Sequence, residues 1–335
     1  MKNYIVAVFA LLFLVCGHWP EANAAPYYEG KVIKIVVGYK PGGGYDRMAR
    51  LVAKHLPKYI PGKPAMIIEN MEGASSIIAA NHLYNIAKPD GLTIGTFNRA
   101  IPFAQLTKQA GVKFDVLKYA WIGSTSVEST ILAMRTDLPV KTIDDMLKSK
   151  SPIILGSTGP TEISSQFPNM LKEYSAPNMN LKLIIYPSSA DVMLAIERKE
   201  IEGRAGSYSS IKPFLDRGVM KAVLRGRIAE KGTEQLPINE DLATSKLGKT
   251  VMYMFSVADL IGRPFVSPPN TPQPQMRILT EGFAKLANDP QMIDDSRRAS
   301  MEIQYTSGKD ILKVITSFLN QPKDVTAEFS KHVAF

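Results

Sequence analysis

Apolar residues along the first half of the chain alternate between strand-like and helix-like spacing. The β-branched run over residues 31–37 has the length of a strand and leads into the glycine-rich segment Gly38 to Gly44. From Tyr45 onward, apolar residues recur at helical spacing until Pro61-Gly62 interrupts the pattern. Further elements are predicted as strands over 65–69 and 92–97, a helix over 75–87 and a turn over 89–91. This order is typical of an α/β fold in which helices cover both faces of a parallel sheet.

The second half of the chain follows the same plan. A strand is predicted over 131–134, and Thr142 and Asp145 have the spacing of a capping box at a helix start. Strands are predicted over 153–155 and 181–186. Of three further predicted helices, one ends near residue 172, one begins at 188–191 and one spans 275–287. Two more helical patterns surround residues 301–305. With 335 residues, the chain is long enough for two domains, each with its own core.

The first 24 residues have the pattern of a secretory signal peptide. Lys2 supplies a positive charge, and Ile5 to Val15 form an apolar run too short to span a bilayer. Ala22-Asn23-Ala24 supplies the small residues of a cleavage site. A lipidated Cys follows a small residue, whereas Cys16 follows Val15, so lipidation is disfavoured. We expect residues 1–24 to be removed and the rest to be exported to the periplasm as a soluble protein.

Composition and motifs narrow the chemistry. The chain is 45% hydrophobic and 21% charged and contains one Cys, which excludes disordered, collagen-like and disulfide-based proteins. A formal net charge of +9 without a long basic run suits an anionic small molecule or an acidic surface. The sequence has no histidine pair at metal-binding spacing, no GxSxG motif, and neither a complete dinucleotide fingerprint nor a P-loop. We therefore expect no metal, cofactor, catalytic nucleophile or nucleic-acid partner.

Glycines and hydroxyl groups are the candidate binding groups. Gly42, Gly43 and Gly44 lead into a helix whose first N–H groups and positive dipole end attract anions, although a purely structural turn is the alternative. Asp46 is expected in the first helical turn, where it complements the dipole or contacts the ligand directly. Other polar side chains at expected strand ends and helix starts are Ser75, Ser76, Thr96, Asn98, Ser157, Thr158, Thr161, Ser188, Ser189 and Ser207 to Ser209. Each alone is typical of a helix cap, but together they are expected to form two walls of neutral donors around an anion.

Five segments give the chain a resemblance to a known family. Ile33 to Asp46 follow the form I-x-x-V-V-x-F/Y-x-P-G-G-x-x-D, and Glu69 to Ala74 follow E-N-x-x-G-A. Pro89-Asp90-Gly91, Phe114 to Lys118 and the P-x-N-T-P stretch Pro268 to Pro272 come next in family order. On these motifs, which span about residues 30–310, the chain resembles the exported solute-binding proteins of tripartite tricarboxylate transporters, of the TctC or Bug type.

The resemblance implies an α/β fold of the periplasmic-binding-protein type II kind. Each of its two domains is a mostly parallel sheet flanked by helices, and the ligand cleft lies between the domains. The implied domains are 25–125 with 257–335, and 126–256, joined by crossing strands near 121–127 and 252–258. The implied function is the capture of a small di-, tri- or aromatic carboxylate by a monomer, without a reaction, and its delivery to membrane permease subunits.

The ligand-binding positions follow from the matching loops. In the family, the loops matching Pro41 to Asp46 and Gly73 to Ser76 hold a ligand carboxylate, and the loops matching Gly156 to Thr161 and Ser188 to Asp191 face them. The residues expected at the ligand are Tyr39, Gly42, Gly43, Gly44, Asp46, Ala74, Ser75, Ser76, Asn98, Arg99, Ser157, Thr158, Thr161, Ser188, Ser189, Asp191, Ser207 and Tyr208.

Some positions depart from the family pattern. Ser75-Ser76 replaces the usual Gly-Gly, and Arg99 is unexpected. We hypothesise that Arg99 or Arg204 pairs with a second anionic group of the ligand, because guanidinium groups prefer carboxylates. Two other functions remain open at this stage: a sensory module for a signalling receptor and, less favoured, an enzyme that uses Asp46, Asp191 or Glu162.

Overall fold

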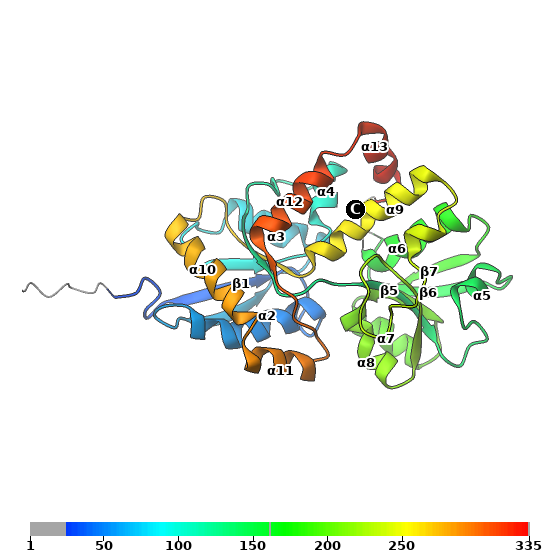
Figure 1. Cartoon of the computed structure of the whole chain (residues 1–335), viewed down its shortest axis with the longest axis horizontal. Helices are drawn as coiled ribbons and strands as arrows, with labels where there is room; N and C mark the ends of the chain where they lie inside the picture. The colour runs from blue at the N-terminus through cyan, green and yellow to red at the C-terminus, as the bar shows by residue number, and fades with distance from the viewer. Residues whose placement is uncertain (1–24, 161, 334–335) are drawn as a thin grey trace, which may run out of the picture.

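The computed structural model describes residues 25–333, with the exception of residue 161. The predicted signal peptide and the predicted site residue Thr161 lie outside this range. Within it, no helix combines the length and the apolar composition needed to cross a membrane. Two sheets organise the chain, and Figure 1 shows them in two lobes that lie side by side.

The first sheet has six strands in the order β11-β4-β10-β3-β1-β2. Their bounds are β1 (Val32–Val37), β2 (Ala65–Asn70), β3 (Thr93–Thr96), β4 (Ala120–Ser124), β10 (Pro264–Ser267) and β11 (Thr306–Ser307). β1 runs parallel to β2 and β3, whereas β10 runs antiparallel to β3 and β4, and β11 runs antiparallel to β4. The strands predicted over 31–37, 65–69 and 92–97 are confirmed. The expected mostly parallel sheet is instead mixed, because only the pairs β1–β2 and β1–β3 are parallel and the other three pairs are antiparallel.

Helices cover both faces of this sheet. Ile33 and Ile35 of β1 pack with α2 (Gly44–His55) and α10 (Gln273–Leu286), while Val36 packs on the opposite face with α3 (Ile77–Asn85). This alternation arises because successive side chains of a strand point to opposite faces. The remaining helices of this part are η1 (Leu56–Tyr59), η2 (Ala74–Ser76), α4 (Ile101–Leu106), α11 (Pro290–Arg298) and α12 (Gly308–Leu319). We call the sheet and these helices the first lobe.

The second sheet has five strands in the order β7-β6-β8-β5-β9. Their bounds are β5 (Thr130–Arg135), β6 (Ile153–Ser157), β7 (Leu181–Ile185), β8 (Gly203–Ser207) and β9 (Met220–Arg225). β6 is parallel to β7 and β8, and β5 is antiparallel to β8 and β9. With α5 (Ile143–Leu147), α6 (Ile163–Ser175), α7 (Ser189–Glu197) and α8 (Tyr208–Asp216), this sheet forms the second lobe. The capping box predicted at Thr142 and Asp145 is confirmed at the start of α5.

The second lobe returns to the first through a helix. After η3 (Asn239–Leu242), α9 spans Lys246–Ile261 and is followed by Gly262, Arg263 and β10. The crossing strand predicted near 252–258 is therefore wrong. Ser245 caps α9, and the helix is buried on several sides, because every residue from Met254 to Asp259 is buried as well as Val251 and Met252. The strand predicted near 121–127 is confirmed only to Ser124, where β4 ends.

Two segments pass side by side between the lobes. Residues 125–129 connect β4 to β5, and the Glu128 N–H donates to the Asp259 carbonyl at 3.1 Å. Gly262 has a φ of +64°, and a Cβ at this position would lie 1.6 Å from the Ser126 carbonyl oxygen. Only glycine allows this close approach of the two backbones.

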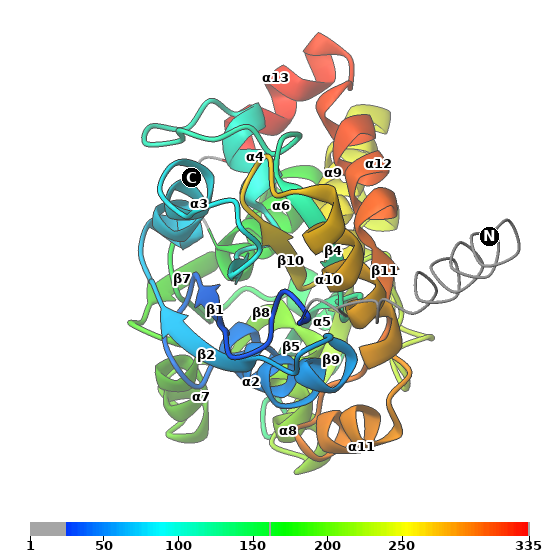
Figure 2. The same ribbon diagram turned by 90° about the vertical axis from the view of Figure 1, so that its left-hand side faces the viewer.

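The C-terminal helix α13 (Lys323–His332) contacts both lobes. Tyr174 of α6 donates to Glu328 at 3.1 Å. The buried Phe329 ring packs against Phe103 of α4 and Phe318 of α12, with centroid distances of 5.1 and 5.5 Å. Figure 2 shows α12, α13 and α9 at the same end of the molecule as α4. The predicted domain boundaries remain a prediction, since this helical layer is shared by the two lobes.

Candidate functional site

A cleft of about 840 Å³ lies between the two lobes, where the parallel strands of each sheet end. β1, β2 and β3 lead into loops of its first-lobe wall, and β6, β7 and β8 lead into its second-lobe wall. Open α/β sheets bind ligands at such strand ends. The predicted site residues that line the cleft are Tyr39, Gly42, Gly43, Gly44, Ala74, Ser75, Ser76, Asn98, Arg99, Thr158, Ser188, Ser189 and Ser207. Their contact with a ligand remains a prediction.

Asp46 shapes the loop before α2. Its carboxylate accepts hydrogen bonds from the Gly42 N–H at 2.9 Å, from Arg50 Nε at 2.9 Å and from Asn70 Nδ2 at 3.0 Å. Burial alone would raise the pKa of Asp46, but these hydrogen bonds outweigh it and hold the pKa below its usual value. Asp46 is 1% exposed and does not line the cleft. Asp46 therefore holds the loop before α2 in place, and its contact with a ligand remains a prediction.

Gly44 begins α2 and lets a guanidinium approach the helix start. The first N–H groups of a helix have no acceptor within the helix and favour a negative charge. A Cβ on Gly44 would lie 2.6 Å from Nη2 of Arg263, which also lines the cleft. The glycine at this position therefore brings backbone donors and a cationic side chain to one part of the wall.

The neighbouring loop after β2 is strained. Ala74, Ser75 and Ser76 have φ values of 45°, 50° and 77°, a left-handed conformation that side-chain-bearing residues rarely adopt. Such strain costs about 1–3 kcal/mol per residue and concentrates at ligand-binding sites. Because of these φ values, α3 begins at Ile77, two residues after the predicted start of the helix. The sequence carries no signal for this distortion beyond the flanking Gly73.

Two stacked tyrosines lie on the first-lobe side of the cleft. The Tyr39 and Tyr45 rings lie 4.7 Å apart with an interplanar angle of 17°. Tyr45 Oη accepts a hydrogen bond from the Arg99 N–H at 2.9 Å. Tyr208, the other predicted aromatic residue, donates to the Lys231 carbonyl at 3.0 Å and does not line the cleft.

Several hydroxyl groups of the second lobe are helix caps or loop supports. The Ser188 hydroxyl accepts from the Asp191 N–H at 3.2 Å and donates to its carboxylate at 2.6 Å, at the start of α7. Ser157 Oγ lies 2.7 Å from Ser164 Oγ and 2.6 Å from Ser165 Oγ. Ser157 and Asp191 do not line the cleft, because these local bonds hold their side chains within the second lobe.

Arg99 is neutralised within the protein. Its Nη2 lies 2.9 Å from the Asp259 carboxylate and donates to Thr130 Oγ1 at 2.9 Å, and its Nη1 lies 3.9 Å from Glu128. Glu128 also pairs with Arg263. Burial raises the pKa of Asp259 to about 6 even though Arg99 acts in the opposite direction. Arg99 thus joins the first lobe to α9 through Asp259 and to segment 125–129 through Glu128. These two carboxylates already compensate its charge.

Arg204 differs from Arg99 in having no acidic partner. It is 4% exposed and lines the cleft, yet no carboxylate of the described residues lies within 4.0 Å of its guanidinium. Its hydrogen bonds go to backbone carbonyls, of Ala205 at 3.2 Å and of Ser189 at 3.5 Å. Burial lowers the pKa of Arg204 to about 10, with a smaller opposing effect of Glu162. At pH 7 the side chain is therefore a buried, charged group without a direct ion pair, and Glu162 acts on it only from more than 4.0 Å.

Asn98 adds a neutral donor to the first-lobe wall. Its Oδ1 accepts from the Ala100 N–H at 2.9 Å, whereas its Nδ2 has no hydrogen-bond partner among the described residues. The side chain is 1% exposed. An unpaired buried donor costs about 1–3 kcal/mol, which an acceptor on a ligand would offset.

The structure adds cleft residues that the sequence did not single out as ligand-binding. Glu162 precedes α6 and lines the second-lobe wall, and Arg47 and Arg263 line the first-lobe side. Arg47 Nη1 donates to the Ala299 carbonyl at 3.1 Å. Glu162 has a sequence signal, since it lies in the loop after β6, but Arg263 reaches the cleft only through the crossing at Gly262. Among the described residues, no cluster of His, Cys, Asp and Glu is arranged to hold a metal ion.

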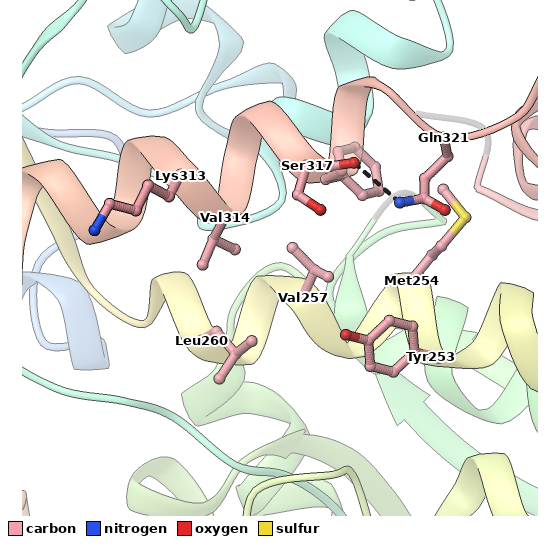
Figure 3. Close-up of a pocket in the computed structure, with 9 residues that line it drawn as sticks. Tyr253, Met254, Val257, Leu260, Lys313, Val314, Ser317 and Gln321 are labelled. Carbon is pink, nitrogen blue, oxygen red and sulfur yellow. Dashed lines mark hydrogen bonds between the residues drawn. The ribbon is translucent and has the colours of Figure 1, made fainter.

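A second, smaller hollow lies away from these groups. It measures about 230 Å³ and lies between α9 and α12. Figure 3 shows Val257 and Leu260 of α9 facing Val314 and Lys313 of α12, with Tyr253 and Gln321 at one end. Its lining is mainly apolar, so the larger cleft is the better site for an anion.

Comparisons with known proteins agree with this geometry. The family model described as "Tripartite tricarboxylate transporter family receptor" matches residues 48–330. A UPF0065 protein of Bordetella pertussis is 24% identical over 96% of this chain and 95% of its own length. Among solved structures, the periplasmic binding protein BugD has a TM-score of 0.72 at 19% identity, covering 91% of this chain and 98% of its own. MatC from Rhodopseudomonas palustris, solved with bound malate, has a TM-score of 0.70 at 15% identity, covering 89% of this chain and 99% of its own.

These comparisons establish the fold and the family. The two solved structures share the arrangement of two mixed sheets flanked by helices, which confirms the predicted fold class. The family model covers most of the chain, including the cleft loops after β2, β3, β6, β7 and β8. The chain belongs to the receptors of the tripartite tricarboxylate transporter family, the TctC or Bug type of solute-binding protein.

Proposed function

We propose that this protein is a periplasmic receptor that holds a small organic carboxylate in the cleft between its lobes. It delivers the carboxylate unchanged, as a monomer, to the permease subunits of a tripartite tricarboxylate-type transporter. Membership of the receptor family supports this proposal. The malate bound to MatC, which shares the fold, is a carboxylate of the proposed kind.

The observation that carries the proposal is the buried guanidinium of Arg204. A buried charge without a partner is costly, and an anion entering the cleft would compensate it. The opposite wall offers the start of α2, whose first N–H groups have no acceptor within the helix and suit a carboxylate. A carboxylate ligand that contacts Arg204 on one side and these donors on the other would therefore bridge the two lobes.

Of the two arginines predicted to bind a second anionic group, we assign this role to Arg204. Arg99 already contacts Asp259 and Thr130 and lies near Glu128, so an anion there would face two existing carboxylates. Arg204 has no such competition within 4.0 Å among the described residues. Residues 125–129 and 262–263 are the proposed hinge, since they pass between the lobes as irregular segments.

Thermal unfolding with a carboxylate panel tests the proposal. Protein expressed from the full coding sequence is unfolded and refolded to remove bound ligand, then heated with mono-, di- and tricarboxylates and aromatic acids. A ligand at 100 times its Kd adds about 2.7 kcal/mol to the free energy of unfolding, which raises Tm by several degrees. Stabilisation by one class, with the compound recovered unchanged, supports a receptor. Consumption of the compound would instead support an enzyme, and no stabilisation by any acid would contradict the proposal.

Replacing Arg204 tests the assigned residue. Arg204→Met removes the charge but keeps an unbranched, apolar side chain, and we expect it to weaken binding of the stabilising acid by about tenfold or more. Arg298→Met is the matched control, because the Arg298 side chain is 72% exposed on α11. Equal affinities of Arg204→Met and the parent protein would exclude Arg204 as the anion-binding residue.

A further inference from the structure

Glu162 places a carboxylate in the cleft on the same lobe as Arg204. It is the residue before α6 and lines the second-lobe wall. Tyr39 Oη donates to Glu162 Oε2 at 3.5 Å, and the Ser75 hydroxyl also hydrogen-bonds to this carboxylate. Both partners belong to the first-lobe wall, so the Glu162 carboxylate reaches across the cleft and contacts neutral hydroxyl groups.

The Glu162 carboxylate forms no salt bridge with a described residue. Within the described part of the chain, no Lys, Arg or His nitrogen lies within 4.0 Å of Glu162. Of the other cations in the cleft lining, Lys40 is paired with Glu72 at 3.6 Å, and Arg99 and Arg263 are paired with Asp259 and Glu128. Arg47, on the first-lobe side, forms no salt bridge with a described residue and donates to the Ala299 carbonyl at 3.1 Å. Burial raises the pKa of Glu162, although its hydroxyl partners and the more distant Arg204 lower it. The second-lobe wall thus carries one acidic and one basic side chain that attract each other from more than 4.0 Å and form no direct ion pair.

We propose that the ligand is an amino-substituted carboxylate, whose protonated amine binds Glu162 and whose carboxylate binds Arg204. This inference rests on the proposed function of the cleft. An ionised carboxylate has about four acceptor positions, and two hydroxyl donors leave room for an ammonium group, which has three N–H donors. A zwitterionic ligand would compensate the buried Arg204 and the partly buried Glu162 at once.

A ligand with only anionic groups fits this wall less well. Bound to Arg204, it would bring its negative charge toward Glu162, and like charges at short range in a buried site repel strongly. A protonated amine reverses the sign of that interaction. The backbone donors of the α2 start remain available for a second carboxylate on the opposite wall.

Calorimetric titration with matched pairs of acids tests the inference. The pairs differ only in an α-amino group: succinate and aspartate, glutarate and glutamate, and 3-phenylpropanoate and phenylalanine. We expect the ligand-stripped protein to bind the amino member of at least one pair about tenfold or more tightly than its partner. In Glu162→Gln, which keeps the size of the side chain and removes its charge, we expect that ratio to fall by about tenfold, through weaker binding of the amino member.

Glu281→Gln is the matched control. Glu281 is exposed on α10 and does not line the cleft, so we expect the ratio to stay unchanged. Three results would overturn the inference and leave the proposed function intact. The first is equal affinities within every pair. The others are an unchanged ratio in a folded Glu162→Gln, or tighter binding of both members of a pair in that variant. If Glu162→Gln fails to fold, the pairs measured on the parent protein decide the question. Failure of every acid, with or without an amine, to bind the parent protein would contradict the proposed function itself.

Discussion

Charged residues around the cleft differ in how their charges are compensated. Asp46 is enclosed by Arg50, Asn70 and a backbone N–H, and Arg99 contacts Asp259. These groups hold loops and crossing segments in place. Arg204 and Glu162 have only neutral hydrogen-bond partners in the described structure, and both line the cleft. We therefore expect substitutions of the first kind to change stability and those of the second kind to change ligand affinity.

Asp46→Asn tests the structural role of this carboxylate. Charge-assisted hydrogen bonds contribute about 1.5–3 kcal/mol each, so we expect the variant to lose about 2 kcal/mol of unfolding free energy at pH 7. Because the pKa of Asp46 is lowered in the folded protein, its stabilisation is complete above the unfolded pKa and is lost as the pH falls through the folded one. Denaturant unfolding at pH 7 and pH 3 measures both effects. An equal loss in Asp216→Asn, an exposed partner of Lys212, would contradict this account.

Glu230→Gln tests how a largely desolvated acid beside other carboxylates, near residues 125–129, affects stability. Burial, with the nearby carboxylates of Glu128 and Glu302, raises the pKa of Glu230 to about 7. A raised pKa means that this group favours the folded state below its ordinary pKa, and that this contribution is lost as the pH rises through about 7. We therefore expect Glu230→Gln to be more stable than the parent protein at pH 8, by about 1–3 kcal/mol, and not at pH 4. The same gain in Glu281→Gln, on exposed α10 surface, would exclude burial as the cause.

At the scale of elements, the site depends on short segments between regular ones. Loop 73–76 and the crossing at Gly262 both use left-handed backbone, and both touch the cleft or its proposed hinge. Such conformations persist only where the surrounding packing fixes them. These segments are therefore the most sensitive to a single added methyl group.

Gly262→Ala tests the crossing. A Cβ here would meet the Ser126 carbonyl at 1.6 Å, so we expect a loss of more than about 2 kcal/mol in unfolding free energy. Gly218→Ala is the matched control, because Gly218 has a similar φ of +70° but no atom within 4 Å of an added Cβ. Its cost should be limited to backbone strain, about 1–2 kcal/mol. Equal losses in the two variants, measured by denaturant unfolding, would show that the crossing tolerates the added group.

The sequence predicts helices and strands best where the spacing of apolar residues reflects a single buried face. The strand over 31–37 and the helix after Tyr45 are confirmed by β1 and α2, because each pattern reflects one buried face. The segment 252–258 was predicted as a strand, yet it is the buried middle of α9, where apolar residues on several sides obscure the helical period. The start of α3 was misplaced by two residues, because tertiary contacts impose the left-handed conformation of Ser75 and Ser76.

The loops that line the candidate site can be predicted from the sequence. Glycine and hydroxyl residues at strand ends indicated most of the lining, since strands of one direction end at one edge of a sheet. The partners of the charged residues were not predictable. Arg99 meets Asp259, and Gly44 meets Arg263, only because the chain returns from the second lobe at Gly262. No local pattern carries that information, so Arg99 and Arg204 could not be distinguished from the sequence.

At the scale of the whole molecule, the C-terminal helices link the two lobes. α13 contacts α6 of the second lobe through Glu328 and Tyr174, and the first lobe through Phe329. These contacts lie in the same helical layer as α9, which leads into the crossing at Gly262. We expect this layer to limit how far the lobes move apart.

Phe329→Ala tests the link. The side chain is fully buried, and truncation of a buried Phe costs about 3–5 kcal/mol. We expect Tm to fall by several degrees and the radius of gyration of the ligand-free protein, from X-ray scattering, to increase. Leu247→Ala is the control, because Leu247 is 42% exposed on α9. An unchanged Tm and radius of gyration in Phe329→Ala would show that α13 does not join the lobes.

The central claim is that the cleft recognises the negative charge of a carboxylate. Calorimetric titration of the ligand-stripped protein with the acid that stabilises it most, and with the primary amide of that acid, tests this claim most directly. The two compounds have nearly the same shape and differ in charge at one group. The account predicts 1:1 binding of the acid and at least about tenfold weaker binding of the amide. Binding of the amide as tight as that of the acid would contradict it.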